Sequence, residues 1–202
     1  MNRILTVIAL MFALSINAQQ RYENKAFGYS MQEPKGWIFA NTADQEANLM
    51  KLDLTDQQLT EILERHKGSV HIQSFYKYDP QTHHGLVPAI QINAREKKNE
   101  DYDRFKTYIT ASAFKFKDIY PDYEFIDEPR EVKVSHIKSI YFSGKFTMKT
   151  QTGQEYRVRS RVYVIPYKHY YFQITFTDSM LEDDCTVEFD RLVKTIKISK
   201  KR

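Results

Sequence analysis

Apolar and polar side chains alternate along several short stretches of the chain, and a period of two predicts half-buried β-strands. The first two stretches flank a turn at residues 34–36 and are expected to pair with each other. Pro88 favours an edge position for the fourth stretch, and Pro129 interrupts the fifth. The predicted strands cover residues 27–31, 37–39, 70–78, 86–94 and 123–134.

Three longer stretches in the second half of the chain predict an antiparallel meander with turns at Gly153 and Pro166. Alternation places the large apolar residues of this meander on one face, which we expect to be buried. These residues are Ile140, Phe142, Phe146, Met148, Val158, Val162, Val164, Tyr170, Phe172, Ile174 and Phe176. The first hairpin of the meander is expected to pair Lys149 with Glu155.

Helical periodicity appears in three segments of the chain. Thr55 and Gln58 have the spacing of a capping box, so the first helix is expected to begin there. The second helix is predicted over residues 101–119, and the third over residues 182–196. Cys185 falls on the apolar stripe of the third helix, which predicts that its thiol is buried.

A sheet with an apolar face must bury that face, and the predicted helices are the available cover. The pattern therefore predicts an α+β fold in which an antiparallel sheet is flanked by helices, an α/β/α sandwich. The sequence contains no internal repeat and no linker-like stretch. Residues 19–202 are accordingly expected to form a single domain.

Residues 1–18 have the order of features found in a secretory signal peptide. Arg3 precedes the apolar run 4–14, and Ala18 ends a short region of small residues. The run is shorter than the roughly 20 residues of a membrane-spanning helix, which is the alternative reading. We therefore expect an exported protein, periplasmic or extracellular, whose mature chain begins at Gln19 and does not span the membrane.

Composition and charge exclude several classes of protein. The chain is 42% hydrophobic with 6 Gly and 6 Pro, which is typical of a globular protein and not of a disordered one. Its net charge of +4, from 30 basic and 26 acidic residues, gives no reason to expect a nucleic-acid partner. Because Cys185 is the single cysteine of the sequence, no disulfide can form within the chain.

The order of the predicted elements resembles the PsbP-like family, which includes the Ran-binding Mog-type and the bacterial DcrB-like proteins. The residues that carry the resemblance are Phe27-Gly28-Tyr29-Ser30-Met31, Pro34, Gly36-Trp37, the strand 170–176, and Phe189, Leu192, Val193 and Ile196. As a layout, it covers nearly the whole mature chain. The resemblance implies an antiparallel sheet flanked by helices and a binding or assembly role without catalysis, but it transfers no functional residue.

Candidate catalytic and metal-binding residues are sparse. His83 and His84 are adjacent in a predicted loop, and His71 lies in the strand before them, with no H-x-x-x-H motif or cysteine pair in support. The chain also lacks a G-x-S-x-G elbow and a Gly-rich phosphate loop. We therefore expect no catalytic residue, no bound metal and no cofactor.

Three arginines form the most distinctive surface feature of the predicted meander. Arg157, Arg159 and Arg161 alternate with other residues and so point away from the apolar face. The predicted pairing places Lys145 opposite Arg159, and like charges that face each other destabilise a sheet. We expect an acidic partner, an acidic part of this chain or solvent over them, with Tyr171 beside the same face.

Three functions remain open on the sequence. The leading hypothesis is an exported, non-catalytic domain that binds a protein partner through the three arginines and Tyr171. A second hypothesis is a small-ligand carrier whose pocket lies between the sheet and the helix at residues 101–119. A third is a metal-dependent hydrolase that uses the three histidines named above.

Overall fold

The computed structural model describes residues 20–40, 54–98, 101–150 and 153–199, and the predicted signal peptide lies outside these ranges. The strands are β1 (Arg21–Asn24), β2 (Tyr29–Gln32), β3 (Ile38–Phe39), β4 (Ser69–Tyr76), β5 (Ala89–Glu96), β6 (Glu124–Val134), β7 (Ile137–Lys149), β8 (Glu155–Tyr167), β9 (Tyr170–Ser179) and β10 (Lys197–Ile198). The helices are α3 (Asp56–Arg65), α4 (Tyr102–Phe114), α5 (Phe116–Ile119) and α6 (Thr186–Val193).

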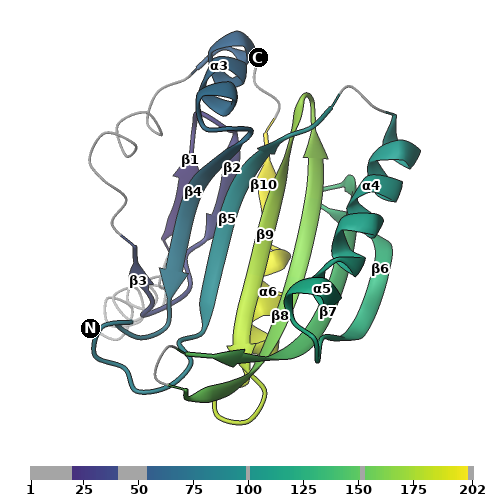
Figure 1. The fold of residues 1–202 in the computed structure, drawn as a ribbon. Helices are drawn as coiled ribbons and strands as arrows, with labels where there is room; N and C mark the ends of the chain where they lie inside the picture. Colours follow the sequence, from purple (N-terminus) through teal and green to yellow (C-terminus); the bar gives the residue numbers. More distant parts are fainter. Residues whose placement is uncertain (1–19, 41–53, 99–100, 151–152, 200–202) are drawn as a thin grey trace, which may run out of the picture.

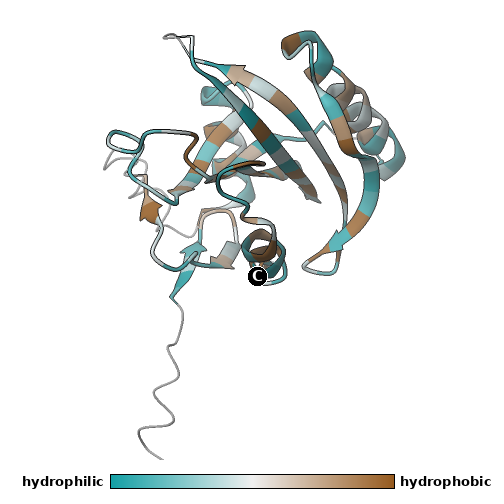
Figure 2. Ribbon diagram, turned by 90° about the horizontal axis from the view of Figure 1, so that it is seen from below, coloured by the Kyte–Doolittle hydropathy of each residue, from teal (hydrophilic) through white to brown (hydrophobic). Residues whose placement is uncertain are grey.

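The strands form two antiparallel sheets (Figure 1). The main sheet has seven strands in the order β3-β4-β5-β9-β8-β7-β6, and the smaller sheet has the order β1-β2-β10. Viewed along the strands, α4 lies on one side of the main sheet, and α6 and the smaller sheet lie on the other (Figure 2). This arrangement confirms the predicted α+β fold with an antiparallel sheet flanked by helices. Among the described residues, no helix is both long enough and apolar enough to cross a membrane.

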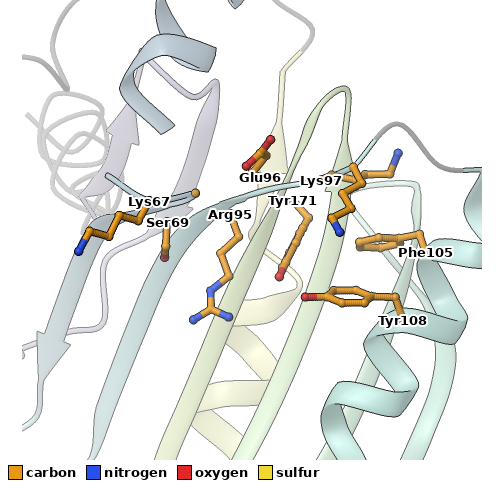
Figure 3. A pocket seen from close by; sticks show the side chains of 10 residues that line it. Lys67, Ser69, Arg95, Glu96, Lys97, Phe105, Tyr108 and Tyr171 are labelled. Carbon is orange, nitrogen blue, oxygen red and sulfur yellow. The ribbon is translucent and has the colours of Figure 1, made fainter. Parts of the chain in front are cut away.

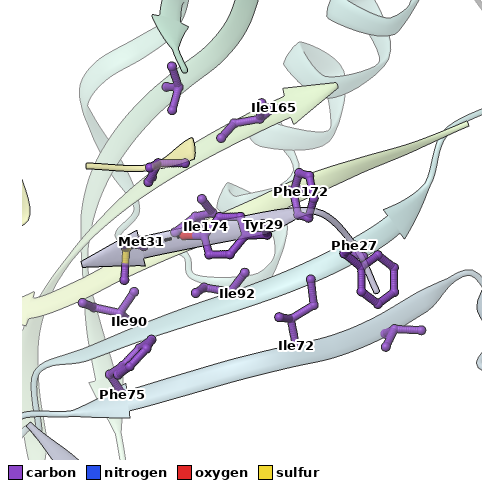
Figure 4. Packing of buried hydrophobic residues seen from close by; sticks show 14 of the residues in the cluster. Phe27, Tyr29, Met31, Ile72, Phe75, Ile90, Ile92, Ile165, Phe172 and Ile174 are labelled. Atoms are coloured by element: carbon purple, nitrogen blue, oxygen red, sulfur yellow. Dashed lines mark hydrogen bonds between the residues drawn. The ribbon is translucent and has the colours of Figure 1, made fainter. Parts of the chain in front are cut away.

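The larger part of the core lies between the main sheet and the smaller sheet (Figure 4). Tyr29 and Met31 project from β2 onto the main sheet, where they meet Ile92, Phe172 and Ile174. All five side chains are fully buried. The Tyr29 hydroxyl donates to Met31 Sδ at 3.4 Å, so this buried phenol has a partner. The predicted strand at residues 27–31 is therefore present as β2 from Tyr29 onward, whereas Phe27 and Gly28 lie in the turn before it.

The other face of the main sheet is covered by α4. This helix begins where Asp101 accepts a hydrogen bond from the Arg104 backbone N–H, an N-cap that satisfies one of the free donors of the first turn. Its buried residues Phe105 and Ile109 pack on the sheet in the same cluster as Phe142. The predicted helix at residues 101–119 is therefore present, although Lys115 separates it into α4 and α5.

The first predicted helix is α3, and its capping box is present. Thr55 accepts from the Gln58 backbone N–H at 3.3 Å, and the Gln58 side chain accepts from the Thr55 N–H at 2.9 Å. The apolar stripe of α3, formed by Leu59, Ile62 and Leu63, is buried as the pattern predicts.

One prediction about the meander is wrong. The apolar residues of β8 and β9 do not share a face, because Val164 pairs with Gln173 while Ile165 pairs with Phe172. Val164 therefore packs under α4, and Phe172 faces the smaller sheet. The register follows from a two-residue turn in which Tyr167 pairs directly with Tyr170. As a result, the strands β8 and β9 contribute buried apolar residues to both faces of the main sheet.

Three further expectations need correction. The segment with Trp37 and Phe39 does not pair with the first strand, since β3 pairs with β4. Pro88 does not mark an edge strand, because β5 lies between β4 and β9 and Pro88 stands just before its first residue. The last helix is shorter than predicted, and Cys185 occupies its N-cap position, where its side chain is buried. The strands β1 and β10 lie outside the residues that were predicted to form strands.

A glycine in β7 makes room for an aromatic ring. Gly144 lies beneath Tyr123, so closely that a methyl group at position 144 would overlap the Tyr123 ring. Tyr123 is 5% exposed and stacks on Phe116. Glycine is required here for space, and the covering ring supplies the side-chain packing that the strand position lacks.

Candidate functional site

The three arginines share one face of the main sheet, as their alternation in β8 predicts, but this face carries α6 and buried apolar residues of β9. The pairing of Lys149 with Glu155 and of Lys145 with Arg159 is also confirmed. Arg159 lies directly opposite Asp178 on β9, and Arg161 lies opposite Phe176. The arginines are therefore on the same face as the apolar residues of β9.

Asp178 is fully buried and binds two of the arginines. It accepts hydrogen bonds from Arg159 Nε at 3.0 Å and Nη2 at 2.7 Å, and from Arg161 Nη1 at 3.0 Å. It also accepts from the Cys185 backbone N–H at 2.8 Å, so the carboxylate joins β8 and β9 to the start of α6. The Asp178 carboxylate raises the pKa of Arg159 further above its ordinary value, and Asp184 adds to this. These guanidinium groups are thus committed to contacts within the chain.

Acidic residues of the same chain also neutralise the outer basic positions. Arg157 Nη1 is 3.2 Å from Asp122 Oδ2, and Lys145 Nζ is 2.8 Å from Glu124 Oε2. The expectation of an acidic cover over the arginines is therefore met within this chain. Of the three arginine side chains, Arg157 is 43% exposed, Arg159 is 14% exposed and Arg161 is 6% exposed. A contact with a partner at this face would depend on Arg157.

Tyr171 does not lie beside the arginines, which corrects the sequence expectation. The same two-residue turn that separates the apolar residues of β8 and β9 places Tyr171 opposite Pro166, on the face covered by α4. There it is 5% exposed and packs against Phe105, with ring centroids 5.4 Å apart. The four residues expected at one contact surface are therefore divided between two faces of the sheet.

The structure does not assemble a metal site from the histidines. The ring nitrogens of His71 lie 3.2 Å from Asn93 Oδ1 and 3.3 Å from Ser74 Oγ. The His83 ring stacks on Tyr78, with centroids 4.4 Å apart. Within the described ranges, no group of three or more His, Cys, Asp or Glu side chains is placed to hold a metal ion.

A pocket of about 350 Å³ opens between the main sheet and α4, the place where the sequence hypothesis of a ligand carrier put one (Figure 3). Its floor is a lateral row of the sheet, because Ser69, Arg95 and Tyr171 are directly paired neighbours on β4, β5 and β9. Phe105 and Tyr108 of α4 form one wall. The remaining lining residues come from the turn after α3 and from the end of β5: Lys67, Gly68, Glu96, Lys97 and Lys98.

Basic and aromatic side chains dominate this pocket. Four of its residues are basic (Lys67, Arg95, Lys97 and Lys98), whereas Glu96 is its one acidic residue. Lys97 Nζ lies 5.7 Å from the centre of the Phe105 ring. Burial raises the pKa of Tyr171, and the positive charge of Arg95 opposes that rise. The pocket therefore keeps a neutral phenol at its floor next to a permanent cation, and it suits an anion carried on an apolar or aromatic body.

Sequence reasoning did not identify Arg95 as a site residue, although a signal for it existed. Gln91, Asn93 and Arg95 alternate with the buried residues of β5, and their side chains point to the face that carries the pocket. A polar row on a strand in the interior of a sheet indicates a face that the core does not cover. The meeting of this row with α4 depends on tertiary packing, which the alternation does not reveal.

No protein-family model matches the chain, and no curated protein matches it. Solved structures share its fold. Cyanobacterial PsbP (CyanoP) from Synechocystis matches with a TM-score of 0.52 and 12% identity over 89% of this chain and 92% of that one. LpqN of Mycobacterium tuberculosis, a protein involved in cell envelope biogenesis, matches with a TM-score of 0.51 and 9% identity over 92% and 87%.

A Bacteroides thetaiotaomicron protein matches with a TM-score of 0.50 and 13% identity over 90% of this chain. The match spans 49% of that protein, which is therefore about twice as long as the matched region. At such low identities these similarities establish the fold, which is that of the PsbP structure, and nothing about the ligand or the reaction.

Proposed function

We propose that this chain is an exported, non-catalytic binding domain of the PsbP-like family, and that the pocket between the main sheet and α4 binds an anionic ligand. The observation that carries the proposal is the lining of this pocket, where four basic side chains lie beside the buried rings of Tyr171 and Phe105. Export rests on the signal-like residues 1–18, and non-catalytic character rests on the absence of a catalytic motif in the sequence.

The pocket supports a ligand carrier better than the arginine face supports a protein contact. Arg159 and Arg161 are bound to buried Asp178, whereas no ion pair of Arg95 with another described residue is present. Arg95 lines the pocket and its side chain is exposed, so its guanidinium is accessible to a ligand. The volume also falls within the range of small-molecule sites, which is roughly 300–1,000 Å³.

Native mass spectrometry of the mature protein, purified gently from the envelope fraction of its own host, tests this proposal. We expect a mass that corresponds to the chain from Gln19 plus a small acidic molecule. The double variant Arg95→Gln/Lys98→Gln should lose the added mass. Arg104→Gln/Lys115→Gln removes the same charge from exposed positions in α4 and directly after it, outside the pocket, and should keep the added mass.

Other results of the same measurement would contradict the proposal. A bare chain from both the wild type and the control variant would show that the pocket is not occupied in the envelope. A second protein bound equally by all three forms would favour the partner-binding hypothesis at another surface. A mass that still contains residues 1–18 would contradict removal of a signal peptide.

A further inference from the structure

We infer that the pocket recognises a carboxylate in preference to a phosphate, with Arg95 as the anchor and the hydroxyl groups of Tyr171 and Tyr108 beside it. This inference rests on the proposed function, because it names the chemical class of the anion that the pocket binds. Three features carry it: the side chains that converge on the pocket, the state of the backbone donors around it and the distribution of charge at its rim.

The side-chain donors in the pocket fit a planar anion. Arg95 lies directly opposite Tyr171 across β5 and β9, and it is paired on its other side with Ser69. The hydroxyl groups of Tyr108 and Tyr171 point toward one another near the Arg95 guanidinium (Figure 3). A guanidinium presents a flat pair of N–H donors that matches the two oxygens of a carboxylate, and each phenol can donate one more hydrogen bond.

Several described backbone N–H groups around the pocket are not available to a phosphate. Phosphate sites are commonly built from free backbone N–H groups at a helix N-terminus or in a nest. Here the N–H groups at the rim already donate to carbonyl oxygens at 2.7–3.2 Å: Gly68 to Leu63, Ser69 to His66, Glu96 to Gly68 and Lys97 to His169. These four donors cannot hold the anion, so we assign its binding to the side chains.

Two features of the rim oppose a second negative charge on the ligand, against the attraction of the four basic side chains. The nearby end of α3 is its C-terminus, since Arg65 is its last residue and Lys67 and Gly68 line the pocket. A helix C-terminus carries the negative end of the helix dipole. Glu96 adds a carboxylate at the same rim. Both features repel a dianion more strongly than a monoanion, and a carboxylate is the monoanion with the matching shape.

The sheet beyond Arg95 offers polar, uncharged contacts to any part of the ligand that extends past the aromatic rings of the pocket. Gln91 and Asn93 continue from Arg95 along β5, and Gln173 pairs with Asn93 on β9. These amide side chains are exposed or half-buried, and they provide both donors and acceptors. A ligand anchored by its carboxylate at Arg95 can therefore extend along this row. A small organic acid and the C-terminal carboxylate of a peptide both meet this description.

Nuclear magnetic resonance titration of the ¹⁵N-labelled mature chain with matched probes tests the inference. The probes are phenylacetate, phenyl phosphate and the neutral phenylacetamide at pH 7. We expect phenylacetate to shift the Arg95 Nε–H signal and the backbone signals of the pocket rim, with weaker binding of phenyl phosphate and none of phenylacetamide. Arg95→Lys keeps the charge but loses the planar fork, and it should weaken phenylacetate binding about tenfold.

A second pair of probes identifies the source of the carboxylate. N-acetyl-alanyl-phenylalanine with a free C-terminus is compared with its C-terminal amide. Tighter binding of the free acid than of phenylacetate indicates a peptide end, and weaker binding indicates a small organic acid. In either case the amide should not bind, and both results support carboxylate recognition.

The inference and the proposed function fail in different ways. Phenyl phosphate binding at least as tightly as phenylacetate would overturn the preference for a carboxylate and leave an anion pocket in place. Equal binding of phenylacetamide would overturn recognition of charge, and so both statements. A chain that shows no shift with any probe, while its amide spectrum shows that it is folded, would also overturn both.

Discussion

Arg159 and Asp178 face each other across β8 and β9, and two parallel hydrogen bonds of 3.0 and 2.7 Å join them. Asp178 is fully buried, and Arg161 binds the same carboxylate. A buried carboxylate between two guanidinium groups is a structural clamp. Removing Asp178 leaves the buried Arg161 guanidinium without a counter-charge, with Thr186 Oγ1 as its remaining hydrogen-bond acceptor, and this cost exceeds the value of the pair itself.

We expect Asp178→Ala to lower the free energy of unfolding by about 3–5 kcal/mol, because it leaves Arg161 unpaired in the core. Urea unfolding followed by circular dichroism measures this loss. The matched control is Glu155→Ala, which breaks the exposed pair with Lys149 and should cost about 1 kcal/mol or less. Equal costs for the two variants would contradict a structural role for the clamp.

Gly144→Ala should lower the free energy of unfolding by about 1–3 kcal/mol, because the added methyl group overlaps the Tyr123 ring. A double-mutant cycle with Tyr123→Ala tests the cause. If the ring is responsible, the methyl group should cost less once Tyr123 is truncated, and the two effects should not be additive. Additive effects would place the origin of the cost elsewhere in β7.

Cys185 should react slowly with thiol reagents in the native protein. Its side chain is buried, and burial raises the pKa of the thiol to about 11, although Lys77 opposes this rise from 3.6 Å. At pH 8 only about one thiol in a thousand is then ionised. We expect labelling by Ellman's reagent to be slow in buffer and complete in 6 M urea. Rapid stoichiometric labelling of folded protein would contradict this burial.

The same thiol contributes to the dependence of stability on pH. Because the pKa of Cys185 is higher in the folded state than in the unfolded one, its contribution is fully present below the unfolded value. That contribution is lost as the pH rises toward about 11. Cys185→Ser should therefore flatten the alkaline part of the stability profile, which urea midpoints between pH 7 and 10 measure.

Asp184 should stabilise the protein at neutral pH and lose this effect in acid. Hydrogen bonds from Thr186 and from Arg159 lower the pKa of Asp184. A carboxylate with a lowered pKa stabilises the folded state above its unfolded pKa, and the effect fades as the pH falls through the folded value. Asp184→Asn should cost up to about 1 kcal/mol at pH 7, because the side chain is partly exposed. This difference should shrink at pH 2–3. A constant difference would show that charge is not involved.

The sequence patterns predicted the elements better than their mutual arrangement. The capping box at Thr55, the helix beginning after Asp101 and the pairing of Lys145 with Arg159 all depend on local spacing, and the structure confirms them. The second hairpin depends on the length of one turn. Lys168 and His169 are the two residues between the paired ends of this turn, and Lys168 has a left-handed conformation with φ of 51°. A register that differs by one residue moves every side chain of β9 to the opposite face of the sheet. The prediction that Tyr171 lies beside the arginines assumed such a register.

The pocket could be predicted only in part. Its position beside the helix at residues 101–119 followed from the expectation that a helix covers the sheet. Its chemistry could not be predicted, because Arg95, Lys67 and Tyr108 come from three separate parts of the chain. The proximity of such residues depends on the order of the strands in the sheet, and alternation along a single strand carries no information about that order.

The smaller sheet imposes an order on folding. Its central strand β2 pairs with β10, and Arg21 Nη2 donates to the carbonyl of Thr195, 174 residues further along the chain. The strands nearest the two ends of the described chain, β1 and β10, therefore lie on either side of β2 in this sheet. During synthesis, β2 can pair with β1 at once, but its second partner β10 is made only after the meander, which is built from hairpins that close locally. The smaller sheet is thus completed last, and a chain truncated before β10 would leave one side of β2 open.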